Sequence, residues 1–132
     1  MARNKPSIVF LDTHIVVWLY AGLTEKISDT ARQAIEENDL MVSPLVKLEL
    51  QYLFEIGRIT VKPDTIIKNL FAAIGLTVSE TPLQQIIEEA LKINWTRDVF
   101  DRMLSAETMV TGGGFITADK KIKSNLKLAI WY

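Results

Sequence analysis

Four acidic residues occupy positions where a carboxylate is unexpected. Asp12 follows directly on the apolar run IVFL and precedes a second apolar run. Asp119 ends the segment FITAD, again just after strand-like residues. Glu49 shares a helical stripe with apolar residues in SPLVKLELQYLFEIG, and Asp101 borders the apolar face of RDVFDRMLSAETM. A lone carboxylate in an apolar setting costs free energy unless something pairs with it, so these residues need a partner.

Each of these acids also has an ordinary structural interpretation. Asp12 can cap the helix after it, and Asp119 can begin the turn ADKK. Asp98 can cap a later helix with Asp101 in its first turn, where the helix dipole favours acids. Glu49 can pair with a basic neighbour at the edge of its helix. Two acids at strand ends and two near apolar helix faces nevertheless favour one shared site.

Four carboxylates in one pocket cannot all stay ionised without a cation. Two unit charges about 4 Å apart repel by about 4 kcal/mol at an effective dielectric constant of about 20. Either some pKa values rise or a divalent cation binds. The chain has no cysteine and one histidine, so ligation by oxygen alone favours Mg²⁺ or Mn²⁺ over zinc. Such a site suits metal-assisted hydrolysis of a phosphodiester bond.

The segments that must position these acids alternate between strand-like and helix-like patterns. Strands are expected at 8–11, 40–43, 76–78, 115–117 and 127–131. Helices are expected from residue 15 and over 28–38, 44–57, 63–74, 82–93 and 98–111. This alternation predicts an α/β fold, a three-layer α/β/α sandwich with a central parallel sheet of four or five strands. Ligands of such sheets bind beyond the carboxyl ends of the strands, where Asp12 and Asp119 are expected.

Length and composition are consistent with a single domain over residues 1–132. The chain is 48% hydrophobic and 23% charged, values typical of a globular protein in water. The absence of cysteine fits a reducing, cytoplasmic compartment. The N-terminal MARNKPS is short and basic, and Asp12 interrupts the apolar run behind it. We therefore expect neither a signal peptide nor a membrane span.

Basic residues surround two of the acids in the sequence. Removing four site carboxylates, −4, from the net charge of −1 leaves +3 for the rest of the chain. A basic rim around an acidic pit can bind a polyanion and still hold a cation. The same residues can also form an ordinary solvated face. They are Arg97, Arg102, Lys120, Lys121 and Lys123.

Several other residues invite a functional interpretation. His14, the lone histidine, can act as a base, although packing or hydrogen bonding beside the site is the simpler interpretation. Residues 18–20 are expected in the core, with dimer or partner contacts as the alternative. Residues 112–114, three glycines, indicate a helix stop and lack the Lys-Ser/Thr of a phosphate loop. The terminal LAIWY is expected to be an edge strand with Trp131 and Tyr132 covering the core.

The segments LDTHIVVWL, SPLVKLEL, RDVFDRMLSAETM and FITAD, in this order and spacing, resemble a PIN domain. They are most similar to the VapC-like ribonuclease toxins of bacterial type II toxin–antitoxin systems. In this resemblance, Thr117 matches a position that often carries a hydroxyl group near the site. The resemblance leaves Asp98, in a segment where many relatives have Asp-Pro, as an alternative to Asp101 for the third ligand. It assigns the family's catalytic, metal-binding acids to Asp12, Glu49, Asp101 and Asp119.

The resemblance also implies what the protein does. It implies a nuclease that needs Mg²⁺ or Mn²⁺ and cleaves RNA endonucleolytically. It further implies a cytoplasmic homodimer and a cognate antitoxin, which lays a helix into a groove and can send a basic side chain into the acid pocket.

Three other functions share features with this pattern. A phospho-acceptor receiver domain also has an acidic Mg²⁺ pocket, but it needs paired acids after the first strand, and Asp12 stands alone. A haloacid-dehalogenase-like phosphatase needs an acid two residues after Asp12, where His14 stands. A catalytically silent binding module of the PIN fold is compatible with all of the sequence features.

Overall fold

The computed structural model describes residues 7–131 and contains a five-stranded sheet. All strand pairs are parallel, and the strand order is β3-β2-β1-β4-β5. The strands are β1 (Ile8–Leu11), β2 (Asp39–Val42), β3 (Thr77–Val78), β4 (Gly114–Ile116) and β5 (Ala129–Ile130).

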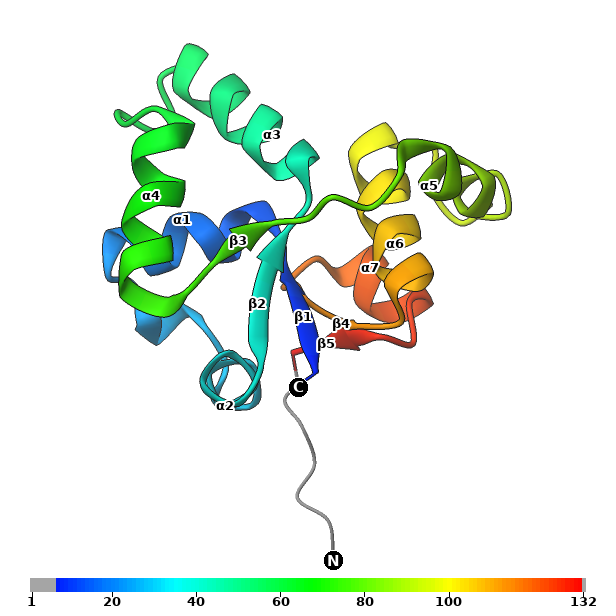
Figure 1. Cartoon of the computed structure of the whole chain (residues 1–132), viewed down its shortest axis with the longest axis horizontal. Helices are drawn as coiled ribbons and strands as arrows, with labels where there is room; N and C mark the ends of the chain where they lie inside the picture. Colours follow the sequence, from blue (N-terminus) through cyan, green and yellow to red (C-terminus); the bar gives the residue numbers. More distant parts are fainter. Residues whose placement is uncertain (1–6, 132) are drawn as a thin grey trace, which may run out of the picture.

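Helices cover both faces of this sheet, which confirms the predicted three-layer α/β/α architecture (Figure 1). Helices α1 to α4 lie on one side and α5 to α7 on the other. The change of side follows from right-handed crossovers, because the chain moves outward from β1 to β3 and then returns to β4 and β5. The helices are α1 (Thr13–Ala21), α2 (Asp29–Glu37), α3 (Pro44–Glu55), α4 (Pro63–Ile74), α5 (Leu83–Ala90), α6 (Val99–Thr111) and α7 (Lys120–Asn125), with a short 3₁₀ helix at Thr24–Lys26.

Local sequence signals explain where several helices begin and end. Ser28 caps α2 as predicted, because its Oγ accepts a hydrogen bond from the Ala31 N–H at 3.2 Å. Helix α4 has Pro63 in its first turn and ends at Gly75, whose φ of +75° suits glycine. Its bounds match the predicted 63–74.

Strand β1 is the central strand of the sheet and is covered on both faces. Val9, Phe10 and Leu11 are each at most 2% exposed, which accounts for their continuous apolar run. Leu11 is in register with Ile116 of β4. The carboxyl ends of β1 and β4 are therefore neighbours, and the residues that follow them meet at one edge of the sheet.

The three glycines at 112–114 stop a helix and allow close packing. Gly112 ends α6 with a φ of +73°. At Gly113, an added Cβ would lie 2.4 Å from the carbonyl oxygen of Ile8, so no larger residue fits without movement of the backbone. The predicted helix stop is confirmed.

Some predicted elements differ from the structure. Helix α7 was not predicted, and Asp119 caps this helix where a simple turn was expected. The last strand covers only Ala129–Ile130 of the expected 127–131. Met1–Pro6 and Tyr132 lie outside the described residues. None of the helices within residues 7–131 has the length and apolar character needed to cross a membrane.

Candidate metal and nuclease site

A pocket of about 450 Å³ opens beyond the carboxyl ends of β1 and β4. In the sheet, β2 lies on one side of β1 and β4 on the other side. The strand order therefore reverses between β1 and β4, where the pocket lies. Ligands of parallel sheets bind at such switch points. The pocket is lined by Asp12, His14, Trp18, Glu49, Asp98, Phe100, Asp101, Ala118 and Asp119.

Asp12 is held in place by three hydrogen bonds. Its backbone N–H donates to the Ile116 carbonyl at 3.0 Å, which ties it to β4. Its Oδ1 accepts from the Thr13 N–H at 2.8 Å, and its Oδ2 accepts from the Thr117 hydroxyl at 2.6 Å. Burial raises the pKa of Asp12, and the Thr117 hydrogen bond works against that rise. Asp12 therefore caps α1 and also faces the pocket, so its two interpretations are compatible.

Glu49 reaches the pocket from α3, and a buried hydroxyl orients it. Thr13 is 1% exposed, and its Oγ1 donates to the Glu49 Oε1 at 2.5 Å. Burial raises the pKa of Glu49, and this hydrogen bond lowers it. Lys47, on the same helix, pairs instead with Asp64 of α4 at 2.7 Å. Glu49 thus forms no ion pair with a lysine or arginine of the described residues.

Asp98 and Asp101 enter the pocket at the start of α6. Asp98 caps the helix, since its Oδ1 accepts from the Asp101 N–H at 2.9 Å. The pKa of Asp101 is raised to about 6, first by burial and then by repulsion from Asp98, Asp119, Asp12 and Glu49. The other four carboxylates are therefore close enough to Asp101 to influence it electrostatically. Both Asp101 and its alternative, Asp98, line the pocket.

Asp119 completes the set from the loop after β4. Its backbone N–H donates to the Thr117 Oγ1 at 3.0 Å. Its Oδ1 accepts from the Ile122 N–H at 2.9 Å and so caps α7. The Thr117 hydroxyl therefore connects Asp12 with the backbone of Asp119. Thr117 was expected near the site, whereas Thr13 was not identified, because a threonine in the first turn of a helix is unremarkable in sequence.

The donor atoms of this pocket match the requirements of a hard divalent cation. The acids offer carboxylate oxygens, and burial together with repulsion between neighbouring carboxylates raises the pKa values of Asp12, Glu49 and Asp101. Within residues 7–131, no group of three or more acidic or histidine side chains is already arranged to enclose an ion. The capping hydrogen bonds of Asp12, Asp98 and Asp119 hold these side chains at their own helices.

The predicted basic rim is only partly present. The Arg102 guanidinium turns inward and donates to the Ile93 carbonyl through Nε, at 3.1 Å, and Nη2. Arg102 thus holds the loop between α5 and α6, and its assignment to the rim was wrong. The other four basic residues, Arg97, Lys120, Lys121 and Lys123, are exposed.

Comparisons with known proteins agree with this geometry. A sequence profile of the PIN domain matches residues 9–126, which contain all of the pocket acids. The chain therefore belongs to the PIN-domain family. It is 30% identical over 119 residues to Ribonuclease VapC22 of Mycobacterium tuberculosis (strain ATCC 25618 / H37Rv), covering 89% of this chain and 91% of that protein. The predicted resemblance to VapC-like PIN domains is confirmed.

A solved structure has the same fold. It is the crystal structure of VapBC2 from Rickettsia felis bound to a DNA fragment from its promoter. The TM-score is 0.61 at 16% identity, and the match covers 92% of this chain and 95% of the other. At this identity the likeness concerns the fold alone.

Proposed function

We propose that this protein is a VapC-type endoribonuclease that depends on Mg²⁺ or Mn²⁺ and acts as the toxin of a toxin–antitoxin pair. The main support is the meeting of Asp12, Glu49, Asp101 and Asp119 in one pocket at the switch point of the sheet. The ribonuclease name of the similar VapC22 protein supports the choice of RNA as the substrate.

In this proposal the same four acids hold the cation. A divalent cation bound there would supply Lewis acidity toward a phosphodiester and a water molecule. Thr117 and Thr13 act as positioning residues, because their hydroxyls fix the carboxylates of Asp12 and Glu49. The carboxyl group of Asp101, whose pKa is raised to about 6 in the cation-free protein, must be ionised when the cation binds.

The alternatives fit the site less well. A receiver domain needs an acceptor Asp after β3, and Ser79, which is 4% exposed, stands there. It also gives no role to Glu49, whose carboxylate is oriented toward this site by Thr13. A silent binding module keeps the fold without the chemistry, and the experiment below distinguishes it from a nuclease.

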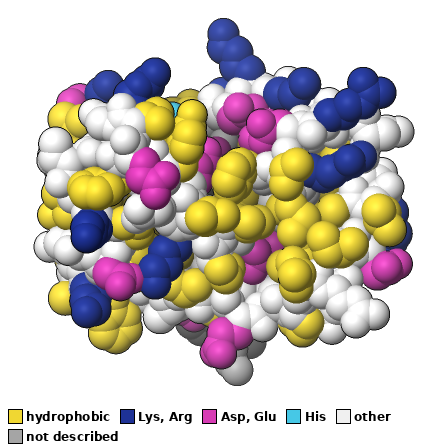
Figure 2. Space-filling model, turned by 90° about the horizontal axis from the view of Figure 1, so that it is seen from above, with side chains coloured by type: hydrophobic (Ala, Val, Ile, Leu, Met, Phe, Trp, Pro, Cys, Tyr) yellow, Lys and Arg dark blue, Asp and Glu magenta, His cyan; other side chains and the backbone are white. Residues whose placement is uncertain are grey.

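A protein partner is part of the proposal. The solved structure of similar fold is a VapBC complex, and this chain has exposed apolar side chains that a partner could cover. Leu48 and Tyr52 of α3 are 58% and 56% exposed, and Ile56, directly after this helix, is 49% exposed. Figure 2 looks down on the α3 and α5 side and shows hydrophobic side chains gathered across this face. These side chains support binding of an antitoxin or of a second copy of the chain.

The test is cleavage of a total RNA pool with Mg²⁺ and with EDTA, comparing wild type with Asp12→Asn. Asparagine also caps helices well, so the variant should fold while losing cleavage. Asp39→Asn is the matched control, because Asp39 is exposed at the start of β2, away from the pocket. Full activity of a folded Asp12→Asn protein, or equal activity in EDTA, would reject the proposal.

A further inference from the structure

Three aromatic side chains form a row that leads away from the carboxylate pocket. The ring centroids of His14 and Trp18 are 6.2 Å apart, and those of Trp18 and Trp131 are 6.3 Å apart. We call His14, Trp18 and Trp131 the aromatic row. His14 and Trp18 line the carboxylate pocket, whereas Trp131 lines a second pocket of about 650 Å³. The aromatic row therefore connects the two pockets.

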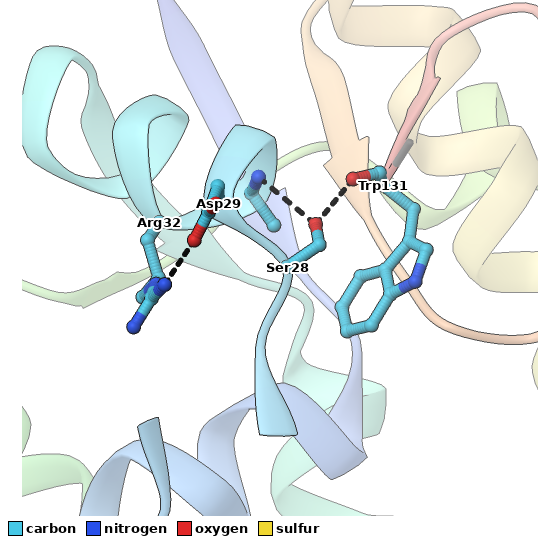
Figure 3. A network of polar contacts seen from close by, with 5 residues as sticks. Ser28, Asp29, Arg32 and Trp131 are labelled. Atoms are coloured by element: carbon cyan, nitrogen blue, oxygen red, sulfur yellow. Dashed lines mark hydrogen bonds and ion pairs between the residues drawn. The ribbon is translucent and has the colours of Figure 1, made fainter. Parts of the chain in front are cut away.

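The fold holds this row in place. His14 and Trp18 are four residues apart on α1, so they lie on the same face of the helix. Trp131 follows β5, and its carbonyl accepts a hydrogen bond from the Ser28 hydroxyl at the cap of α2 (Figure 3). Both tryptophans are only partly buried, so part of each ring can contact a ligand.

Positive charge accompanies the aromatic row. The Lys26 Nζ lies 5.8 Å from the centre of the Trp18 ring, and the Lys123 Nζ lies 5.8 Å from that of Trp131. Lys123 and Lys127 line the second pocket. None of these three lysines forms an ion pair with another side chain of residues 7–131. The acids nearest in sequence are Glu25, Asp29 and Asp119; Asp29 is paired with Arg32 (Figure 3), and Asp119 belongs to the carboxylate pocket.

We infer that the aromatic row, with Lys26, Lys123 and Lys127, is the binding track for single-stranded RNA entering the carboxylate pocket. This inference rests on the proposed function and names the form of its substrate. Proteins bind single strands by stacking bases on aromatic rings while lysines contact the phosphates. Here one lysine lies beside each of the two tryptophan rings. The second pocket combines two lysines, Ser124 and Asn125 with Leu126, Ala129 and Trp131, so a ligand there meets both cations and apolar side chains.

The inference can be measured in an Asp12→Asn background, which separates binding from cleavage. The probe is a fluorescent random 12-nucleotide single-stranded RNA, followed by anisotropy at several salt concentrations. Each base stacked on an aromatic ring contributes about 1–3 kcal/mol, so Trp131→Ala should weaken binding about 5- to 150-fold. Duplex RNA of the same length should bind more weakly, because paired bases cannot stack on the rings.

Charge variants keep the test valid if Trp131→Ala does not fold. Lys26 and Lys123 are exposed, so Lys26→Gln with Lys123→Gln should leave the fold intact. Each lost phosphate contact lowers the slope of log K against log salt by about 0.7 for a single strand, and the double variant should lose about 1.4. Lys68→Gln, exposed on α4, is the matched control and should leave both binding and slope unchanged.

Failure of this inference differs from failure of the proposed function. If the wild type does not cleave RNA, but Trp131→Ala and the lysine double variant weaken RNA binding as expected, the nuclease function is rejected and the track is kept. Cleavage by wild type, with RNA binding unaffected by Trp131→Ala and by the lysine double variant, would refute the track. If the same variants weaken binding of a purified antitoxin but leave RNA binding unaffected, the aromatic row contacts protein. That result would also refute the RNA track.

Discussion

The proposed site predicts that cation affinity depends on pH through Asp101. Its pKa of about 6 means that this carboxyl group is largely ionised at pH 7 and largely protonated at pH 5. A carboxylate must be ionised to bind a cation. The ionised fraction of a group with this pKa falls about tenfold between these pH values, so affinity for Mg²⁺ should also fall about tenfold. The raised pKa values of Asp12 and Glu49 act in the same direction.

The raised pKa of Asp101 also determines how the stability of the protein changes with pH. Between the usual Asp value of 3.8 and about 6, the folded chain keeps a proton on Asp101 that the unfolded chain releases. Without a cation, the free energy of unfolding should therefore fall as pH rises through this window. A bound cation favours the ionised carboxylates, so its stabilising effect should be larger at pH 7 than at pH 5.

The assay is thermal unfolding with MgCl₂ or MnCl₂ titrated at pH 5 and pH 7 and constant ionic strength. The melting temperature should rise at lower cation concentration at pH 7. Asp101→Asn should remove most of the pH difference, whereas Asp39→Asn, exposed at the start of β2, should preserve it. Equal cation affinity of the wild type at both pH values would show that these carboxylates do not share a cation.

Three other substitutions test separate parts of the structure. Thr117→Val removes the hydroxyl that donates to Asp12, so RNA cleavage should fall about 10- to 100-fold at unchanged fold, and unchanged cleavage rates would exclude its positioning role. Glu107 is fully buried, and neither carboxyl oxygen has a hydrogen-bond partner within the described residues. Glu107→Met should therefore raise the free energy of unfolding by about 1–3 kcal/mol in urea titrations, and a decrease would indicate a hidden partner. Gly113→Ala places a Cβ 2.4 Å from the Ile8 carbonyl oxygen and should cost about 1–3 kcal/mol in the same titration; an unchanged midpoint would mean that the backbone relaxes freely.

Elements with strong local signals were predictable from the sequence. The bounds of β1 and α4 match the prediction, because an unbroken apolar run defines the strand and Pro63 and Gly75 frame the helix. Helix α7 was missed because it has six residues, of which Ile122 alone is buried. Such a segment has no hydrophobic period, and Asp119 serves equally well as the first residue of a turn.

The site acids were predictable because each contrasts with its apolar neighbours. The supporting residues were less visible. The Trp18–Trp131 contact depends on the strand order of the sheet, which local patterns do not reveal. On helix α6, Met103 and Leu104 are buried, whereas the apolar residues Phe100 and Val110 are only partly buried. Residues 103–108 are all buried, Glu107 among them, because α5 packs against α6 in addition to the sheet.

The position of β1 in the middle of the sheet also affects when the pocket forms as the polypeptide is synthesised. Asp12 and Glu49 emerge early, but β1 lacks one of its two neighbours until β4 is made more than a hundred residues later. Asp119 lies beyond β4, so it is the last acid of the pocket to be synthesised. A nascent chain that ends before β4 therefore cannot form the pocket, and a ribosome making this protein is not exposed to a completed site until β4 and Asp119 have been translated.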